Sequence, residues 1–369
     1  MSFVNTQTTK VDELIDKALQ GEALTLEEGL VLYESNDLIK LGAGAKQMML
    51  KHVPDNLGTF VINRNINYTN VCDTYCRFCA FYRTEKDADA YVLSDEVIFN
   101  KIAEAVELAG QERGVEILMQ GGTHPNLPFS YYTDLLRKIK AKFPGITMHS
   151  FSAAEIRKMV EVSGLSLAEV IQQLKEAGLD SLPGGGAEIL DDRTRMRISR
   201  LKESWQEWMN VHAEAHKQGM KTTATMVIGF GESLEERLLH FIRVREQQAL
   251  TGGFTAFISW VYQPDNTALK GTRATAVEYL KNLAISRLMV NNVRNFQSSW
   301  VTMGEKIGQL ALEFGCNDMG STMIEENVVS AAGAHNRMNK EALIRTIHDA
   351  GRVAALRDTQ YNILEVYNK

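Results

Sequence analysis

Three of the four cysteines of this chain lie within eight residues of one another, as Cys72, Cys76 and Cys79 in a C-x3-C-x2-C pattern. Thiolates this close together on one loop can converge on a single soft metal centre. A structural zinc site normally uses two separated pairs of ligands, and an electron-transfer cluster uses four cysteines, whereas the remaining Cys316 stands alone. The triplet therefore favours a [4Fe–4S] cluster held at three irons, with the fourth iron open to a substrate or cofactor. A zinc site completed by Cys316 or by a histidine remains the alternative.

The cysteine triplet follows a short apolar run, and beyond it such runs alternate with longer amphipathic segments. Strands separated by helices of this length indicate right-handed βαβ units and a parallel sheet. The number of units favours an α/β fold of the (β/α) TIM-type barrel class over a doubly wound open sheet, and the loops that follow barrel strands form the catalytic face. We expect the strands at residues 59–66, 115–120, 146–151, 179–183, 222–229, 254–261, 293–300 and 316–323.

Both ends of the chain differ from this alternating region. Residues 1–57 carry apolar residues at helical spacing, and Thr25 with Glu28 matches a capping box, so we expect an N-terminal helical segment. We expect residues 58–300 to form the barrel core. Residues 301–369 are expected to form a small αβ extension that closes the barrel.

The composition is that of an ordinary globular protein, with 44% hydrophobic residues, which excludes a disordered chain. The net charge of −6 leaves no basic excess to neutralise phosphates, so we expect no nucleic-acid partner. No apolar run approaches the roughly 18 residues that span a bilayer, so we expect no membrane partner. The N-terminus lacks a secretory signal pattern, and clustered cysteines suit a metal site better than disulfides, so we expect a reducing cytoplasm.

Four longer segments extend the signal of the cysteine loop. They are NRNINYTNVCDTYCRFCAFYR (63–83), MQGGTHPNLPFSYYTDLLRKIKAKFP (119–144), LDSLPGGGAEIL (179–190) and GGFTAFISWVYQPDNT (252–267). The cysteine loop resembles that of the radical S-adenosylmethionine (SAM) superfamily. The four segments together resemble its futalosine and deazaflavin enzymes. Residues 257–267 favour the branch that cyclises dehypoxanthine futalosine in menaquinone synthesis. The alternatives within the superfamily are enzymes of the aminofutalosine synthase type and of the deazaflavin (FO) synthase type.

The resemblance implies a radical SAM barrel in which Cys72, Cys76 and Cys79 bind the cluster and its open iron binds SAM. Reductive cleavage of SAM would give a 5′-deoxyadenosyl radical, which takes a hydrogen from the ribose-derived C4′ of the substrate. The carbon radical would add to the benzoate ring, and loss of an electron and a proton would restore aromaticity. The implied partners are this small-molecule substrate and an electron donor such as flavodoxin or ferredoxin.

Several residues of the matching segments would hold SAM. Gly121, Gly122 and Thr123 stand where the superfamily usually has Gly-Gly-Glu, whose backbone meets the amino group of SAM. Two glycines let the backbone approach a ligand closely, whereas Thr123 loses the acidic contact. Phe78 and Gly229 would lie near the adenine. Ordinary loop packing is the alternative for Phe78.

The loop Pro183–Glu188 contains three consecutive glycines, which cost conformational entropy and so indicate an unusual backbone. It lacks the phosphate-binding glycine patterns, so we do not expect it to hold nucleotide phosphates. Glu188 would bind the ribose hydroxyls of SAM, and Lys202 or its rival Arg200 would face the SAM carboxylate. Glu188 and His149 are the candidate bases for the final proton transfer.

Four further side chains would contact the substrate. Tyr68 and Arg83 flank the cysteine loop, and Trp260 and Gln263 end a predicted strand; loop packing is the alternative for each. A non-catalytic zinc or iron–sulfur binding module is the remaining interpretation of the chain. The many βα units and glycine-rich turns favour the enzyme, because a small binding module needs neither.

Overall fold

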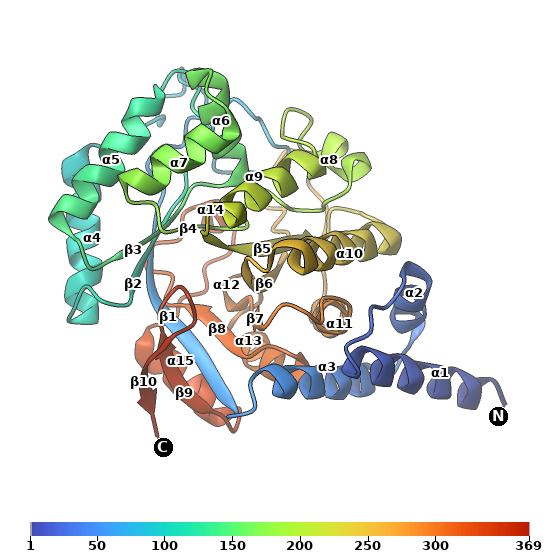
Figure 1. Cartoon of the computed structure of the whole chain (residues 1–369). Coiled ribbons are helices and arrows are strands. Elements are labelled where there is room, and N and C mark those ends of the chain that lie inside the picture. Colours follow the sequence, from blue (N-terminus) through green and yellow to red (C-terminus); the bar gives the residue numbers. More distant parts are fainter. Residues whose placement is uncertain (1, 369) are drawn as a thin grey trace.

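The computed structural model describes residues 2–368, with residues 2–9 described by their backbone alone. Eight parallel strands pair in sequence order, and the last pairs with the first, which closes a barrel (Figure 1). The predicted TIM-type barrel is therefore confirmed. The strands are β1 (Leu57–Ile66), β2 (Val115–Met119), β3 (Thr147–Ser150), β4 (Ser181–Leu182), β5 (Lys221–Ile228), β6 (Phe254–Val261), β7 (Asn295–Gln297) and β8 (Asp318–Ser321).

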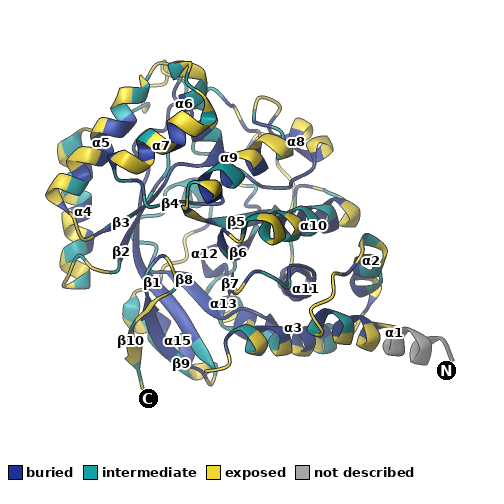
Figure 2. Cartoon of the chain, viewed as in Figure 1, coloured by how far each residue is buried: buried dark blue, intermediate teal, exposed yellow. Residues whose placement is uncertain are grey.

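Helices surround this barrel, and most of them turn one face toward the strands and the other toward solvent, whereas the helix Ala276–Met289 is buried along most of its length (Figure 2). Capping boxes fix the starts of α6, α7, α9 and α10, where a serine hydroxyl accepts from the backbone N–H of a glutamate three residues on. The surrounding helices are α4 (Asp95–Ala109), α5 (Phe129–Lys142), α6 (Ala153–Ser163), α7 (Leu167–Ala177), α8 (Asp192–Ile198), α9 (Trp205–Lys217), α10 (Leu234–Thr251), α11 (Ala276–Met289), α12 (Trp300–Met303), α13 (Glu305–Ala311) and the 3-10 helix η1 (Leu312–Phe314).

Three helices precede the barrel, as predicted: α1 (Ser2–Leu19), α2 (Leu26–Glu34) and α3 (Leu38–His52). The predicted capping box of Thr25 and Glu28 is present at the start of α2. These helices lie against α10 and α11, at the lower right of Figure 1. A buried hydrogen bond from the Tyr33 hydroxyl to Asn282 Oδ1 (2.7 Å) joins α2 to α11.

The C-terminal segment adds α14 (Val328–Ala331), α15 (Lys340–Asp349), β9 (Val353–Arg357) and β10 (Ile363–Tyr367). The sequence predicted the helix at α15 and the last strand, but not β9. Strand β9 runs parallel to the first half of β1, from Leu57 opposite Val353 to Phe60 opposite Leu356, and β10 runs antiparallel to β9. The barrel strand β8 lies beyond residue 300. The expected segment boundaries stay a prediction, and their end residues 1 and 369 lie outside the described residues.

The barrel interior is polar along β1, although the strand is buried throughout. Asn63 and Asn65 point inward with Asn67 just beyond the strand, whereas Ile62 and Ile66 pack in the apolar core between strands and helices. Polar residues at every second position therefore leave the interior of the barrel suited to a polar ligand. None of the described helices combines the length and the apolar character needed to cross a bilayer.

Candidate active site

The barrel interior holds a cavity of about 310 Å³. At the end where the strands terminate, its wall includes Phe78 and Cys79 from the loop after β1. At the opposite end it includes Glu116 of β2 and Arg357 of β9. We call these the loop end and the floor of the cavity. Enzymes of this fold place their chemistry at the loop end.

The three clustered cysteines lie on the segment between β1 and α4, which we call the Cys loop (residues 67–94). Its backbone is held by local hydrogen bonds, because Cys72 N–H donates to the Arg83 carbonyl (2.9 Å) and Arg83 N–H to the Asn70 carbonyl (2.8 Å). It is also bound to two other loops, since Arg77 N–H donates to Ile198 (2.8 Å) and the Arg77 carbonyl accepts from Leu269 (2.7 Å). The Cys loop is therefore an ordered part of the barrel mouth.

The chemistry of the three thiols fits a cluster better than a single ion. Burial raises the pKa of the Cys76 and Cys79 thiols, and the neighbouring thiols add to this rise, so the three lie within electrostatic reach of one another. Metal binding deprotonates such thiols outright. Within the described part of the chain, no three Cys, His, Asp or Glu side chains converge as one metal ion requires. A four-iron cluster binds each cysteine at a different iron, so it does not require the three thiols to meet at one ion.

Cys316 does not belong to this group. It is fully buried immediately before β8, at the strand-start end of the barrel, whereas the Cys loop follows the carboxyl end of β1. Because β1 and β8 run parallel, the two positions lie at opposite ends of the barrel. Cys316 therefore cannot complete a zinc site with the triplet.

The two glycines after β2 pack against neighbouring loops. A Cβ at Gly122 would lie 2.1 Å from the carbonyl oxygen of Val71, so a side chain there would displace the Cys loop. A Cβ at Gly121 would lie 2.8 Å from the Tyr68 ring, and Gly121 N–H donates to a carboxylate oxygen of Glu155 (2.9 Å). Loop packing thus explains the need for glycine, and a backbone contact to SAM stays a prediction.

Thr123 ties this loop to the first cysteine. Its Oγ1 lies 3.2 Å from Cys72 Sγ and 2.6 Å from Thr74 Oγ1, and it donates to Asp73 Oδ1 (2.8 Å). Lys158 of α6 pairs with the other oxygen of Asp73 (2.8 Å). Thr123 therefore replaces the expected acidic residue with a hydroxyl that positions the Cys loop.

The glycine-rich loop 183–188 crosses the wall of the cavity. A Cβ at Gly184 would lie 2.7 Å from the backbone of β5, and one at Gly185 would lie 2.5 Å from the side chain of Gln120. Gly184 N–H donates to Thr223 Oγ1 (2.9 Å), and its carbonyl accepts from Thr225 Oγ1 (2.5 Å). Side chains here would collide with the sheet, so the glycines let this loop lie directly on β5.

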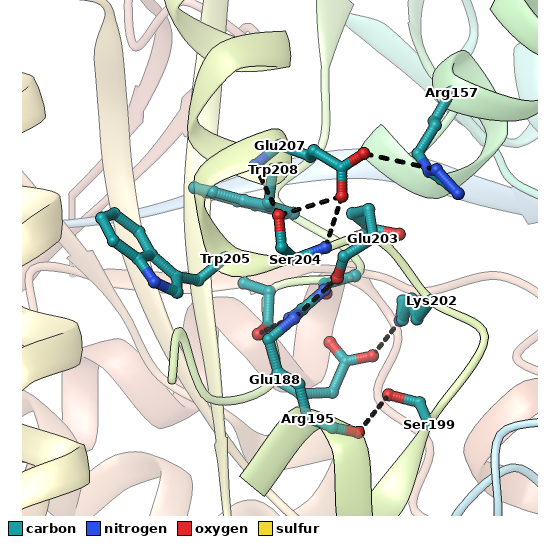
Figure 3. A network of polar contacts seen from close by, with 12 residues as sticks. Arg157, Glu188, Arg195, Ser199, Lys202, Glu203, Ser204, Trp205, Glu207 and Trp208 are labelled. Atoms are coloured by element: carbon teal, nitrogen blue, oxygen red, sulfur yellow. Dashed lines mark hydrogen bonds and ion pairs between the residues drawn. The ribbon is translucent and has the colours of Figure 1, made fainter. Parts of the chain in front are cut away.

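Glu188 and Lys202 form a buried ion pair beside this loop (Figure 3). Burial lowers the pKa of Lys202, but Glu188, Cys76 and Glu203 together more than offset this, so the pKa lies above its ordinary value. Arg195 braces the same region through the Ala187 carbonyl (2.7 Å) and the Glu203 carboxylate (3.1 Å). Arg200 is exposed, so Lys202 is the cation at this site. The Glu188 carboxylate is held in this ion pair, and its predicted roles toward the ribose of SAM and as a base stay predictions.

Phe78 and the loop after β5 form an aromatic wall. The centroid of the Phe78 ring lies 5.2 Å from that of the Phe230 ring, and the Lys202 ammonium lies 5.5 Å from the centroid of Phe78. Gly229 adopts φ +104°, and its N–H donates to Glu232 Oε1 (3.0 Å). Phe78 and Phe230 both face the cavity, an arrangement that could stack on a planar ring.

His149 of β3 faces the cavity and is buried. Its Nδ1 lies 2.5 Å from Ser181 Oγ. Burial lowers its pKa, opposed by Glu116 and assisted by Arg357, so the ring is neutral near pH 7. A neutral imidazole facing the cavity is the kind of group that can accept a proton.

The four predicted substrate contacts divide into two pairs. Trp260 and Gln263 face the cavity, and Gln263 donates to the Val261 carbonyl (2.9 Å). Tyr68 is fully buried outside the cavity wall, where its hydroxyl donates to Glu155 (2.8 Å). Arg83 binds the Asp89 carboxylate (2.7 Å) and backbone carbonyls of the Cys loop. Tyr68 and Arg83 thus hold loops in place, and their predicted contact with substrate gains no support.

Sequence reasoning missed the polar residues of the barrel interior. The cavity wall includes Asn63, Asn65 and Asn67, Glu116, Gln297, and Arg357, Thr359 and Tyr361 of the C-terminal segment. The alternating asparagines in β1 were a visible signal, because polar residues at every second position in a buried strand indicate a polar interior. The C-terminal residues carried no local signal, since only the pairing of β9 with β1 brings them to the cavity.

Comparisons with known proteins agree with this arrangement. Residues 66–242 match the model of the radical SAM superfamily, and residues 251–369 match a model described as the CofH/MqnC C-terminal region. The chain is 56% identical to the cyclic dehypoxanthine futalosine synthase of Halalkalibacterium halodurans, over 97% of this chain and 96% of that protein. It is 43% identical to the protein of the same name from Streptomyces coelicolor, over 98% and 91%. The aminodeoxyfutalosine synthase of S. coelicolor is 38% identical over 96% and 94%.

Solved structures share the fold at low sequence identity. Methylornithine synthase (PylB) superposes with a TM-score of 0.69 at 18% identity, over 92% of this chain and 96% of that one. The hydrogenase maturase HydG from Carboxydothermus hydrogenoformans gives 0.73 at 15%, over 97% and 82%. The full-length matches to enzymes rule out a non-catalytic binding module. The chain belongs to the radical SAM superfamily and, within it, to the family that includes the cyclic dehypoxanthine futalosine synthases.

Proposed function

We propose that this radical SAM enzyme cyclises dehypoxanthine futalosine to cyclic dehypoxanthine futalosine in the futalosine route to menaquinone. The observation that carries the proposal is the 56% identity to a cyclic dehypoxanthine futalosine synthase over 97% of the chain. The aminodeoxyfutalosine synthase is less similar, at 38%. A cavity beside the Cys loop, lined by apolar side chains together with several polar ones, supports a small-molecule substrate that carries both kinds of group.

Membership of the superfamily implies a [4Fe–4S] cluster and SAM. We assign the three cluster ligands to Cys72, Cys76 and Cys79. When bound, the cluster and SAM supply the 5′-deoxyadenosyl radical that abstracts a hydrogen from the substrate, after which the carbon radical adds to the benzoate ring. The residues assigned to hold SAM are Phe78, Gly121, Gly122, Thr123, Glu188, Lys202 and Gly229.

Other side chains of the cavity orient the substrate and take up the proton. Trp260 and Gln263 reach the cavity from the end of β6 and are assigned to the substrate. His149 is assigned as the base that removes the proton from the cyclised ring, because it is neutral and faces the cavity. Its Nδ1 neighbour Ser181 fixes the ring orientation.

The electron donor is assigned as a flavodoxin or ferredoxin. Such a protein has access to the Cys loop from solvent, where Tyr75 and Arg77 are exposed between the cysteines. We assign the enzyme to the reducing cytoplasm, where the cysteines stay available for iron.

The test is anaerobic turnover of the reconstituted, dithionite-reduced protein with SAM and dehypoxanthine futalosine. Mass spectrometry should detect 5′-deoxyadenosine and a product two hydrogens lighter than the substrate. Cys72→Ala should abolish both, whereas Cys316→Ala, at the other end of the barrel, should retain both. Deoxyadenosine without conversion of this substrate would contradict the proposed substrate. Zinc at one ion per chain, without iron–sulfur absorbance, would contradict the cofactor assignment.

A further inference from the structure

The floor of the cavity carries polar atoms that have no hydrogen-bond partner among the residues that the structure describes. They are Asn63 Oδ1, Thr359 Oγ1 and Tyr361 OH, all on residues that line the cavity. Asn63 is 1% exposed and Thr359 7% exposed. An unpaired buried polar group destabilises the fold, so a cluster of them indicates a site completed by a ligand.

Glu116 is the charged member of the floor. It lies directly opposite Asn63 in the pairing of β1 with β2, and its Oε1 accepts from Asn63 Nδ2 (2.6 Å). Among the side chains that the structure describes, Oε2 of Glu116 has no hydrogen-bond partner. One carboxylate oxygen is therefore available to a hydrogen-bond donor in the cavity.

Arg357, the cation of the floor, already has a carboxylate partner. Arg357 binds Asp318 through both Nε (2.5 Å) and Nη2 (3.0 Å), and the Asp318 carboxylate also accepts from Thr59 Oγ1 (2.5 Å). The guanidinium lies 3.9 Å from the centroid of the Tyr361 ring. This packing fixes the Tyr361 side chain, and the ion pair cancels the charge of Arg357.

The charges on the floor favour a hydroxyl over a carboxylate as the ligand group that binds there. Among the described residues of the floor, the two carboxylates of Glu116 and Asp318 face the one guanidinium of Arg357, so the negative charge is in excess, and the neutral His149 does not offset it. A carboxylate on the ligand would be repelled there. A hydroxyl would instead donate to Glu116 and accept from Tyr361 or Thr359, whose hydroxyls are both donors and acceptors.

We propose that Glu116, Asn63, Thr359 and Tyr361 form a subsite for the hydroxyl groups of the ribose-derived half of the substrate. The benzoate carboxylate then lies away from the floor. This inference rests on the proposed function, because it takes its ligand from the substrate assigned above.

The test compares ligand binding to the reconstituted enzyme with SAM present, by anaerobic calorimetry. The ligands are dehypoxanthine futalosine, an analogue with one ribose-derived hydroxyl replaced by hydrogen, and an analogue without the benzoate carboxylate. In the wild-type enzyme, loss of the contacting hydroxyl should weaken binding roughly 10- to 100-fold, as expected for a hydrogen bond to a charged group. Glu116→Ala should remove this discrimination and leave the effect of the missing carboxylate unchanged.

Two near-isosteric variants allow the same comparison if Glu116→Ala disturbs folding. Glu116→Gln and Tyr361→Phe should each reduce the hydroxyl discrimination, and the exposed Glu176→Gln on α7 is the control that should not. If the floor variants still discriminate fully against the analogue that lacks the hydroxyl, the inference is wrong and the proposed function stands. The same holds if Glu116 variants change only the effect of the missing benzoate carboxylate. Failure of the wild-type enzyme to bind the substrate would overturn the proposed function, and the inference with it.

Discussion

At the scale of single residues, His149 is the side chain of the cavity best suited to take up a proton. Glu188 was an equal candidate from the sequence, and its carboxylate is held in an ion pair with Lys202. The radical step consumes no proton, so a missing base should leave cleavage of SAM intact. It should slow only the restoration of aromaticity in the ring.

His149→Gln should therefore uncouple the reaction. We expect 5′-deoxyadenosine to form at a near wild-type rate while product formation falls by about 10²- to 10⁴-fold, the usual contribution of a general base. His52→Gln, a half-buried histidine on α3, is the control and should change neither rate. Wild-type product formation by His149→Gln would exclude this base.

The same assignment predicts a pH profile. Because burial lowers the pKa of His149 from its ordinary 6.5, the neutral, active form predominates throughout pH 6.5–8. The ratio of product to deoxyadenosine should stay constant over that range and fall only below it. A decline beginning above pH 7 would point to another base.

At the scale of elements, the Cys loop depends on the loop after β2. Gly122→Ala would place a Cβ 2.1 Å from the Val71 carbonyl oxygen, so we expect the Cys loop to shift and iron–sulfur absorbance after reconstitution to fall severalfold. Gly110→Ala is the matched control, since its Cβ meets nothing within 4 Å. Its φ of +72° should cost about 1 kcal/mol of stability while leaving the cluster content unchanged. Equal cluster content in both variants would contradict this dependence.

The sequence predicted the barrel because each βα unit is a local pattern of apolar runs and amphipathic helices. It predicted the Cys loop because the three cysteines lie within eight residues. Strand β9 was not predicted because it is only five residues long and because its partner β1 lies far from it in the sequence. Arg357 and Tyr361 were missed with it, since they reach the floor only through that long-range pairing. The roles of Tyr68 and Arg83 depend on the direction in which their side chains point, and the residue type alone does not determine that direction.

At the scale of the whole molecule, buried histidines make the fold sensitive to acid. Burial lowers the pKa of His216 to about 4 and that of His240 to about 3. His240 Nδ1 accepts a hydrogen bond from Leu190 N–H (3.0 Å), which requires the neutral ring. Below pH 6.5 these histidines therefore bind protons in the unfolded chain but stay neutral in the folded chain. The free energy of unfolding decreases as the pH decreases.

Each of these two histidines should lower the free energy of unfolding by roughly 1.4 kcal/mol per pH unit between pH 6.5 and 5. Urea titrations across this range should show the slope, and His240→Gln should reduce it by about one histidine's share. His335→Gln is the control, because His335 is exposed and its replacement should leave the slope unchanged. A free energy of unfolding that is constant from pH 6.5 to 5 would contradict the prediction.

The central claim is that this enzyme closes a ring by taking a hydrogen from the ribose-derived C4′ of dehypoxanthine futalosine. The most direct measurement follows deuterium placed at that carbon through one anaerobic turnover with SAM. We predict 5′-deoxyadenosine one mass unit heavier and a cyclised product without the label. Unlabelled deoxyadenosine, together with a product that retains the deuterium, would contradict the claim.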